Sequence, residues 1–163
     1  LHLPCVQPEK SDLFDAPEVQ DMVALLDALV SPTHDLSLAR ALKSPLFGLG
    51  DDALVALAML RRQPVHAGCS WFDLLLKSEL LPLYMQALGA VLIQYQGWVQ
   101  RLPPHDALHA IYEYGDVLAR FAAAAPVTQR QAVQANLRAL LAAALQHDGG
   151  RYLTPYALSL IHI

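Results

Sequence analysis

Apolar residues recur every three or four positions along most of the chain, and proline or glycine interrupts this pattern at intervals. Such spacing places apolar side chains on one face of an α-helix. An alternation typical of a strand occurs only over residues 3–7, and no repeat typical of a helical solenoid is present. The pattern predicts an all-α protein, an irregular multi-helix bundle with one short N-terminal strand. The predicted helices span residues 15–30, 36–42, 51–61, 70–75, 82–101, 105–125 and 127–147.

Two of these helices begin with a capping signal. Asp15 and Glu18 form a D-x-x-E sequence that resembles a capping box, and Pro17 stands in the first turn, where its missing amide hydrogen costs nothing. Ser70 and Asp73 stand in the same relation at the start of another helix. The predicted apolar faces include Leu36, Leu38, Ala39 and Leu42 in the second helix, and Val133, Leu137, Leu140, Leu141 and Leu145 in the last.

The composition agrees with a folded protein and limits its partners. Of the 163 residues, 55% are hydrophobic and 16% are charged, so burial of apolar surface can offset the entropy lost on folding. The formal net charge of -4 excludes a nucleic-acid binder that is recognisable from bulk charge, and any DNA contact must be local. Cys5 and Cys69 are too few for a disulfide framework or a cysteine-rich zinc site, and they agree with a reducing compartment.

No segment resembles a signal peptide or a membrane span. Residues 80–100 carry no formal charge, but they contain four glutamines and Pro82, and these groups are costly to place in hydrocarbon. We therefore expect a cytoplasmic protein with no membrane partner.

One polar motif resembles a metal site. His105, His109 and Glu113 share a helix face, and Asp106 stands where the zinc motif H-E-x-x-H has its glutamate. The aspartate is one methylene too short to act as that general base, so a solvated polar face is favoured over a metal site. Cys69 has no histidine at a spacing that would make it a nucleophile. We predict no catalytic residue, metal or cofactor in this chain.

A glycine turn joins two of the short predicted helices. Gly48, Leu49 and Gly50 follow the sequence K-S-P-L-F, and Asp51 opens the next helix. Unpaired amides at a helix N-terminus can bind phosphate, and glycines with positive φ allow close approach of a nucleic-acid backbone. By itself, this sequence is better explained by a plain helix–helix connection than by a phosphate site.

Three segments resemble UvrD-like superfamily 1 DNA helicases. Residues 13–21 (LFDAPEVQD) look like their F-x-x-x-E-[IV]-x-D segment, preceded by residues 2–4 in place of a strand that ends in proline. Residues 44–50 (SPLFGLG) stand where these helicases carry the T-P-x-x-G-I-G turn that begins their 2B insertion. The S-P-L-F-G version is more similar to the AddA and RecB branch of helicase–nuclease subunits. Residues 151–157 (RYLTPYA) resemble the R-x-x-T-P-Y-A segment of AddA-like proteins.

The resemblance implies a division of the chain and a function. Residues 1–14 would end a motor-domain segment, residues 15–157 would form the helical 2B-like insertion, and residues 158–163 would be a non-family tail. The implied function is a fragment of an ATP-dependent helicase/exonuclease subunit for double-strand break repair and recombination, in which the insertion holds duplex DNA ahead of the motor. The expected DNA contacts are Lys43, Gly48, Leu49 and Gly50.

The same resemblance sets expectations for the longer protein. The chain contains no P-loop, so we expect it to be inactive by itself, with ATP and Mg²⁺ bound elsewhere in the parent protein. The expected partners are duplex DNA, bound weakly, and a second helicase–nuclease subunit. The alternative is a helical protein-interaction module with no nucleic-acid role, which the net negative charge and the generic helices favour.

Overall fold

The computed structural model describes residues 10–146, and the all-α prediction is confirmed there, because these residues form helices and no strand. Residues 3–7, the predicted strand, and residues 151–157 lie outside the described residues. The helices are α1 (Lys10–Leu13), α2 (Pro17–Val30), α3 (Asp35–Lys43), α4 (Asp51–Arg62), α5 (Trp71–Leu75), α6 (Leu88–Arg101), α7 (Pro104–Gly115), α8 (Val117–Ala124) and α9 (Arg130–Gln146). Short 3₁₀ turns η1 (Pro64–His66), η2 (Ser78–Leu80), η3 (Leu83–Met85) and η4 (Val127–Gln129) lie between them.

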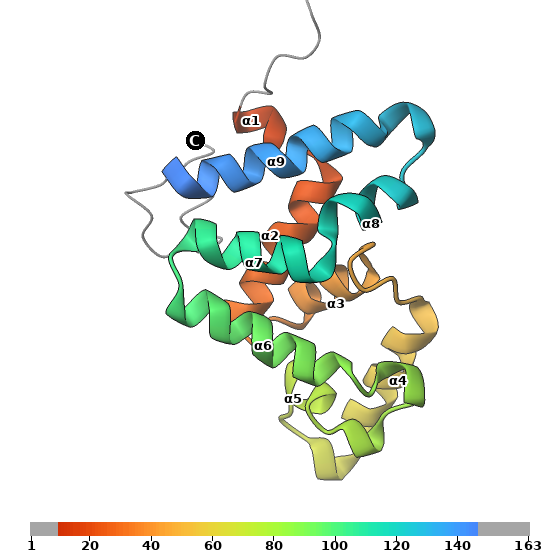
Figure 1. Cartoon of the computed structure of the whole chain (residues 1–163). Coiled ribbons are helices and arrows are strands. Elements are labelled where there is room, and N and C mark those ends of the chain that lie inside the picture. The colour runs from red at the N-terminus through yellow and green to blue at the C-terminus, as the bar shows by residue number, and fades with distance from the viewer. Residues whose placement is uncertain (1–9, 147–163) are drawn as a thin grey trace, which may run out of the picture.

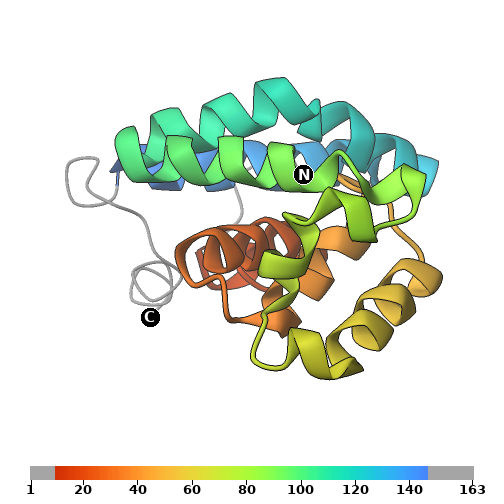
Figure 2. The same ribbon diagram turned by 90° about the horizontal axis from the view of Figure 1, so that it is seen from below.

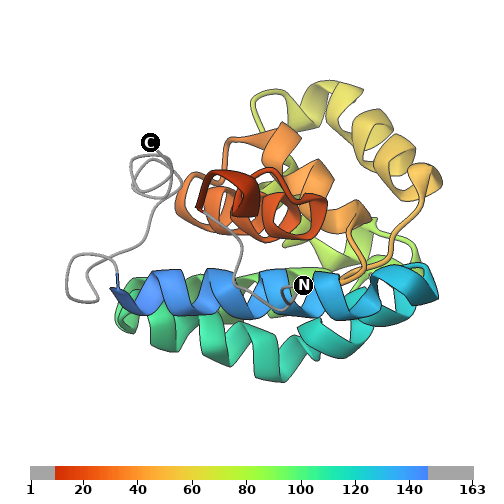
Figure 3. The same cartoon turned by 90° about the horizontal axis from the view of Figure 1, so that it is seen from above.

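The helices are arranged in two layers, which Figures 2 and 3 show from opposite sides. One layer contains α2, α3 and α4, and the other contains α6, α7, α8 and α9. Helix α2 packs on α3 within its own layer and on α6 and α9 of the other, so it joins the two layers. Helix α5 packs against α3, α4 and α6, at the lower end of the molecule in Figure 1.

Aliphatic side chains fill most of the space between the layers. Each completely buried side chain contributes roughly 1.5–3 kcal/mol of transfer free energy, so this core is the main source of stability. The largest of these side chains are Tyr95, Met22, Leu25, Leu29, Leu38, Leu42, Leu57, Leu74, Leu75, Met85, Leu92 and Leu108.

The two capping signals have different outcomes. The capping box of Ser70 and Asp73 is confirmed: each side chain accepts a hydrogen bond from the backbone amide of the other residue. The box predicted at Asp15 and Glu18 is wrong, because Ala16 is the N-cap of α2 and makes no side-chain cap bond. Asp15 lies in the turn that follows α1. Glu18 instead accepts a hydrogen bond of 2.7 Å from Nδ2 of Asn136 in α9.

The helix predicted over residues 105–125 is interrupted. Asp116 has a φ of +51°, in the left-handed region, and it separates α7 from α8. Its amide donates hydrogen bonds to the carbonyls of Tyr112 and Glu113, which end α7. Aspartate tolerates this conformation better than most residues, so the Gly115–Asp116 pair was a usable signal for the break.

One predicted helix start and two predicted helix faces also need correction. The segment from Pro82 begins with the 3₁₀ turn η3, and α6 starts only at Leu88. Leu36 is 89% exposed, because the face of α3 that packs on the core carries Leu38, Ala41 and Leu42. Leu145 is 59% exposed, whereas the small Ala144 beside it is buried. In the described part of the chain, no helix is long and apolar enough to cross a membrane.

Candidate nucleic-acid interface

The turn between α3 and α4 is held by hydrogen bonds within the chain. Ser44 is buried, and its Oγ donates to the carbonyl of Ala41 at 2.6 Å. The amide of Gly48 donates to the carbonyl of Ser44 at 2.7 Å, and the amide of Leu49 donates to the carbonyl of Leu42 at 3.0 Å. The amides of Gly48 and Leu49, two of the predicted phosphate donors, are therefore already occupied.

Only the first of the two glycines has a positive φ. Gly48 has a φ of +64°, and a Cβ added there would meet nothing within 4 Å. Gly50 has a φ of −93° and is the N-cap of α4, so the expectation of positive φ at Gly50 is wrong. The turn needs left-handed backbone only where it reverses direction, at Gly48, and Gly50 already leads into the helix in extended conformation.

Unpaired amides remain at the beginning of α4. Among the described residues, the backbone N–H groups of Gly50, Asp51 and Asp52 have no hydrogen-bond partner. These amides carry the positive end of the helix dipole. The side chains of Asp51 and Asp52 are exposed at the same end, so an incoming phosphate would meet two carboxylates as well as three amides.

Lys43, the fourth predicted contact, is paired across the turn. Its Nζ lies 2.8 Å from Oδ1 of Asp51, and both side chains are exposed. The hydrogen bond and the positive charge of Lys43 lower the pKa of Asp51 below its ordinary value. An exposed pair of this kind contributes little to stability, so Lys43 can exchange Asp51 for a phosphate at small cost.

An aromatic cluster lies directly beside this turn. Phe47 of the turn contacts Tyr95 of α6, with ring centroids 6.4 Å apart, and Tyr95 stacks on Trp98 at 5.7 Å. Tyr114 of α7 meets the rings of Tyr95 and Trp98 edge-on, each at 5.9 Å. Gly115 leaves room for Leu46 of the turn, because a Cβ on Gly115 would stand 2.5 Å from Cδ1 of Leu46.

Burial separates the inner and outer members of the cluster. Tyr95 is 1% exposed, and desolvation, with a smaller contribution from Tyr114, raises its pKa to about 12 although the charge of Arg120 opposes the shift. Trp98 and Phe47 are partly buried, and Tyr114 is 57% exposed. The sequence analysis missed this cluster. A tyrosine and a tryptophan three residues apart on one predicted helix were the only available signal, because the other two rings come from distant segments.

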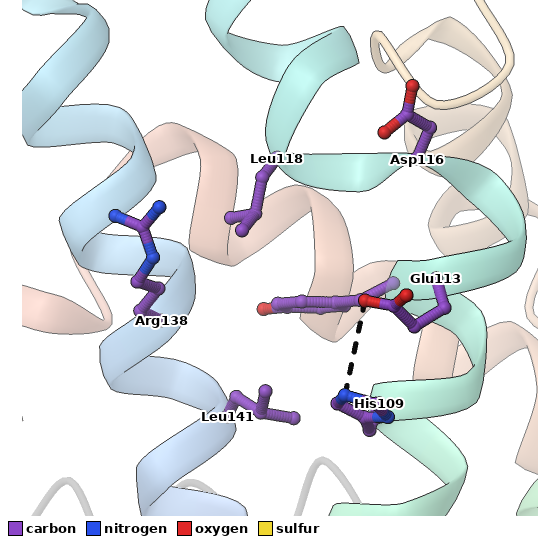
Figure 4. A pocket seen from close by; sticks show the side chains of 7 residues that line it. His109, Glu113, Asp116, Leu118, Arg138 and Leu141 are labelled. Atoms are coloured by element: carbon purple, nitrogen blue, oxygen red, sulfur yellow. Dashed lines mark ion pairs between the residues drawn. The ribbon is translucent and has the colours of Figure 1, made fainter.

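The histidine motif forms one wall of a shallow pocket of about 320 Å³ between α7 and α9 (Figure 4). Nε2 of His109 lies 4.0 Å from Oε2 of Glu113, and Arg138 and Leu141 of α9 line the other side of the pocket. Tyr112 also lines the pocket; its buried hydroxyl donates to the carbonyl of Leu137, and burial raises the pKa of Tyr112. Among the described residues, no three His, Cys, Asp or Glu side chains are grouped so that they could hold a metal ion.

Comparison with known proteins identifies relatives of this chain. No family model matches it. The chain is 28% identical over 161 residues to an ATP-dependent helicase/nuclease protein of Exiguobacterium sibiricum, in a match that covers 98% of the chain and 13% of that protein. It is 29% identical over 165 residues to the exonuclease/helicase protein RexA of Lactococcus lactis subsp. cremoris. It is 30% identical over 165 residues to an ATP-dependent helicase/nuclease protein of Lactococcus lactis subsp. lactis.

The matches extend over nearly all of this chain but only a small part of each relative. The two Lactococcus lactis matches each cover 92% of the chain, and the chain spans only 13% of the length of these relatives. The resemblance that the sequence motifs indicate is thereby confirmed: the chain is similar, over most of its length, to one segment of the large AddA-type helicase/nuclease proteins.

Proposed function

We propose that this chain is the helical insertion of an ATP-dependent helicase–nuclease, where it holds duplex DNA ahead of the motor during double-strand break repair and recombination. The observation that carries the proposal is the similarity of nearly the whole chain to one segment of proteins named as helicase/nuclease subunits. The role is mechanical, with ATP and Mg²⁺ bound in the rest of the parent protein. The proposed protein partner is a second helicase–nuclease subunit.

The start of α4 is the proposed point of contact with the duplex backbone. The amides of Gly50 and the two following aspartates donate to a phosphate, and Lys43 leaves Asp51 to contact the same phosphate. Gly48 and Leu49 contribute by fixing the shape of the turn. Because two carboxylates stand at the same place and only one lysine is near, binding is weak and depends only shallowly on salt.

The test measures binding of the 163-residue chain to a fluorescein-labelled duplex of about 20 base pairs by anisotropy at low salt. Gly50→Val introduces a bulky side chain at the contact without requiring positive φ, and the Cβ would displace only the flexible side chain of Asp52. We expect Gly50→Val to weaken duplex binding about tenfold and to lower the melting temperature by only a few degrees, because valine is a poorer N-cap than glycine.

A pair of strained variants separates contact from folding. Gly48 and Gly68 both have positive φ and open space at the Cβ position, but Gly68 lies in a different turn, after η1. Gly48→Val is expected to reduce duplex binding, and Gly68→Val is expected to lower stability by a similar amount without this loss. The proposed contact is contradicted if Gly48→Val and Gly68→Val lose duplex binding equally. It is also contradicted if Gly50→Val binds the duplex as tightly as the unchanged chain.

The alternative function, a protein-interaction module, is favoured by the outer face of α4. Val55 and Met59 are 55% and 63% exposed, and they are one helical turn apart on the same face. If Val55→Lys with Met59→Lys disrupts assembly with the second subunit while duplex binding by the chain is absent, the interaction role replaces the DNA role.

A further inference from the structure

The outer rings of the aromatic cluster form a rigid surface. Trp98 lies against the buried ring of Tyr95, with an angle of 25° between the ring planes, and Tyr114 stands nearly perpendicular to both rings. The inner ring fixes the orientation of the two outer ones, which come from α6 and α7. Single exposed aromatic residues are common on protein surfaces, but here the 57% exposed ring of Tyr114 and the partly buried ring of Trp98 are held in contact over a buried third ring.

Unpaired positive charge accompanies these rings. Arg40 and Arg61, in the layer of α2, α3 and α4, are paired with aspartates. Arg101 and Arg120 have no carboxylate partner among the described residues. The guanidinium group of Arg101 folds back over Gly97, one residue before Trp98. Arg120 is close enough to the cluster to act on the titration of Tyr95. The cluster therefore has two cations in its surroundings, in a chain whose net charge is negative.

We propose that Trp98 and Tyr114 form a stacking platform for an unpaired base of single-stranded DNA, with Arg101 and Arg120 contacting the adjoining phosphates. Exposed aromatic rings with flanking cations are the combination that binds single strands without sequence preference, because every base has a π-face. Phe47 places this platform beside the turn that precedes α4. The inference goes beyond the proposed duplex contact and does not depend on it.

Intrinsic tryptophan fluorescence provides a direct test. The chain contains two tryptophans, Trp71 and Trp98, so Trp71→Phe leaves Trp98 as the only reporter. Addition of an oligothymidylate of about 15 nucleotides to the full Trp71→Phe chain at low salt is expected to quench the emission in a saturable way. With two phosphates contacted, the logarithm of the binding constant falls against the logarithm of salt concentration with a slope of about −1.4.

Matched variants in the Trp71→Phe background identify the platform. Tyr114→Leu keeps an apolar contact for Trp98 but removes the second ring, and we expect it to weaken oligothymidylate binding about tenfold. Arg120→Gln is expected to weaken binding and to reduce the salt slope. Arg138→Gln, which changes an exposed arginine on α9, is the charge-matched control. It is expected to leave the affinity for oligothymidylate and the salt slope unchanged.

The outcomes separate this inference from the duplex proposal. Absence of saturable quenching, or equal affinity in Tyr114→Leu and its parent, overturns the stacking platform. Gly50→Val is expected to leave oligothymidylate binding unchanged, because its contact is with the duplex. If Gly50→Val retains duplex binding while Tyr114→Leu loses oligothymidylate binding, the duplex contact fails and the platform stands.

Discussion

At the scale of single residues, Gly48 sets the path of the chain from α3 to α4, because its φ of +64° is strained for residues with a Cβ. We predict that Gly48→Val lowers the free energy of unfolding by about 1–2 kcal/mol. Gly48→Asn is expected to cost less, since asparagine enters this region more readily. Urea denaturation of the two variants measures the difference, and equal stability of both would mean that the turn relaxes to another conformation.

His66 is a buried polar residue with an unsatisfied ring nitrogen. It is 6% exposed, and its Nδ1 has no hydrogen-bond partner among the described residues. Replacing an unsatisfied polar group by an apolar one of similar size is nearly neutral or stabilising. We therefore predict that His66→Leu leaves the melting temperature unchanged or raises it. Ser70→Ala, which removes a confirmed cap, serves as the destabilising reference at about 1 kcal/mol.

The pair of Lys43 and Asp51 can be followed by titration. Lys43 lowers the pKa of Asp51, so the attraction is present at neutral pH and disappears as the pH falls through the pKa of Asp51 in the folded chain. In Lys43→Gln, we predict that the pKa of Asp51 rises toward its ordinary value. Carboxyl ¹³C NMR measures this shift directly. An unchanged pKa in Lys43→Gln would show that the pair is not formed in solution.

At the scale of helices, the same sequence signal led to different structures at two sites. Ser70 and Asp73 cap α5, and in the part of the chain that the structure describes their side chains make no other hydrogen bond, so the prediction is confirmed. Glu18 has a competing partner, Asn136, which is 118 positions away along the chain. A local signal cannot reveal such a partner, so the sequence predicted the helix correctly but assigned the wrong role to its first carboxylate.

The bond between Glu18 and Asn136 predicts how α2 and α9 depend on each other. Glu18 is 9% exposed, so Asn136→Ala would leave a largely buried carboxylate without this donor. We expect the free energy of unfolding to fall by about 1–3 kcal/mol. Chemical denaturation at neutral pH measures the loss. The exposed Ala135 beside it can be changed to serine as a control, and a similar loss in that control would argue against the specific bond.

Helix positions were predictable where apolar spacing was regular, and less so where a tertiary contact decided the outcome. The break at Asp116 follows a glycine that leaves space for a side chain of the distant turn. The aromatic cluster also depends on tertiary contacts, since its rings come from a turn and two helices far apart in sequence. The motifs of the turn, in contrast, are contiguous in sequence, and they led to the resemblance to helicase–nuclease proteins.

At the scale of the whole molecule, the two layers bring the candidate contacts together. The turn that follows α3 belongs to one layer and supplies Phe47, whereas Tyr95 and Tyr114 come from the other (Figures 1 and 2). The turn therefore contacts the inner ring of the aromatic cluster through Phe47 and, three residues later, leads into α4 at Gly50. If both proposed contacts hold, the chain would contact duplex backbone and an unpaired base, as a junction of double- and single-stranded DNA requires.

This arrangement leads to a prediction for the longer protein of which we propose this chain to be a segment. If the segment holds the duplex while ATP is hydrolysed elsewhere, Gly50→Val should lower the rate of duplex unwinding several-fold more than it lowers ATPase activity stimulated by single-stranded DNA. Lys43→Ala should act in the same direction but less, because its exposed pair with Asp51 contributes little. Unwinding of a labelled duplex and phosphate release are measured on the same preparations. Equal loss of both activities would indicate misfolding of the longer protein, and loss of neither would remove the start of α4 from the mechanism.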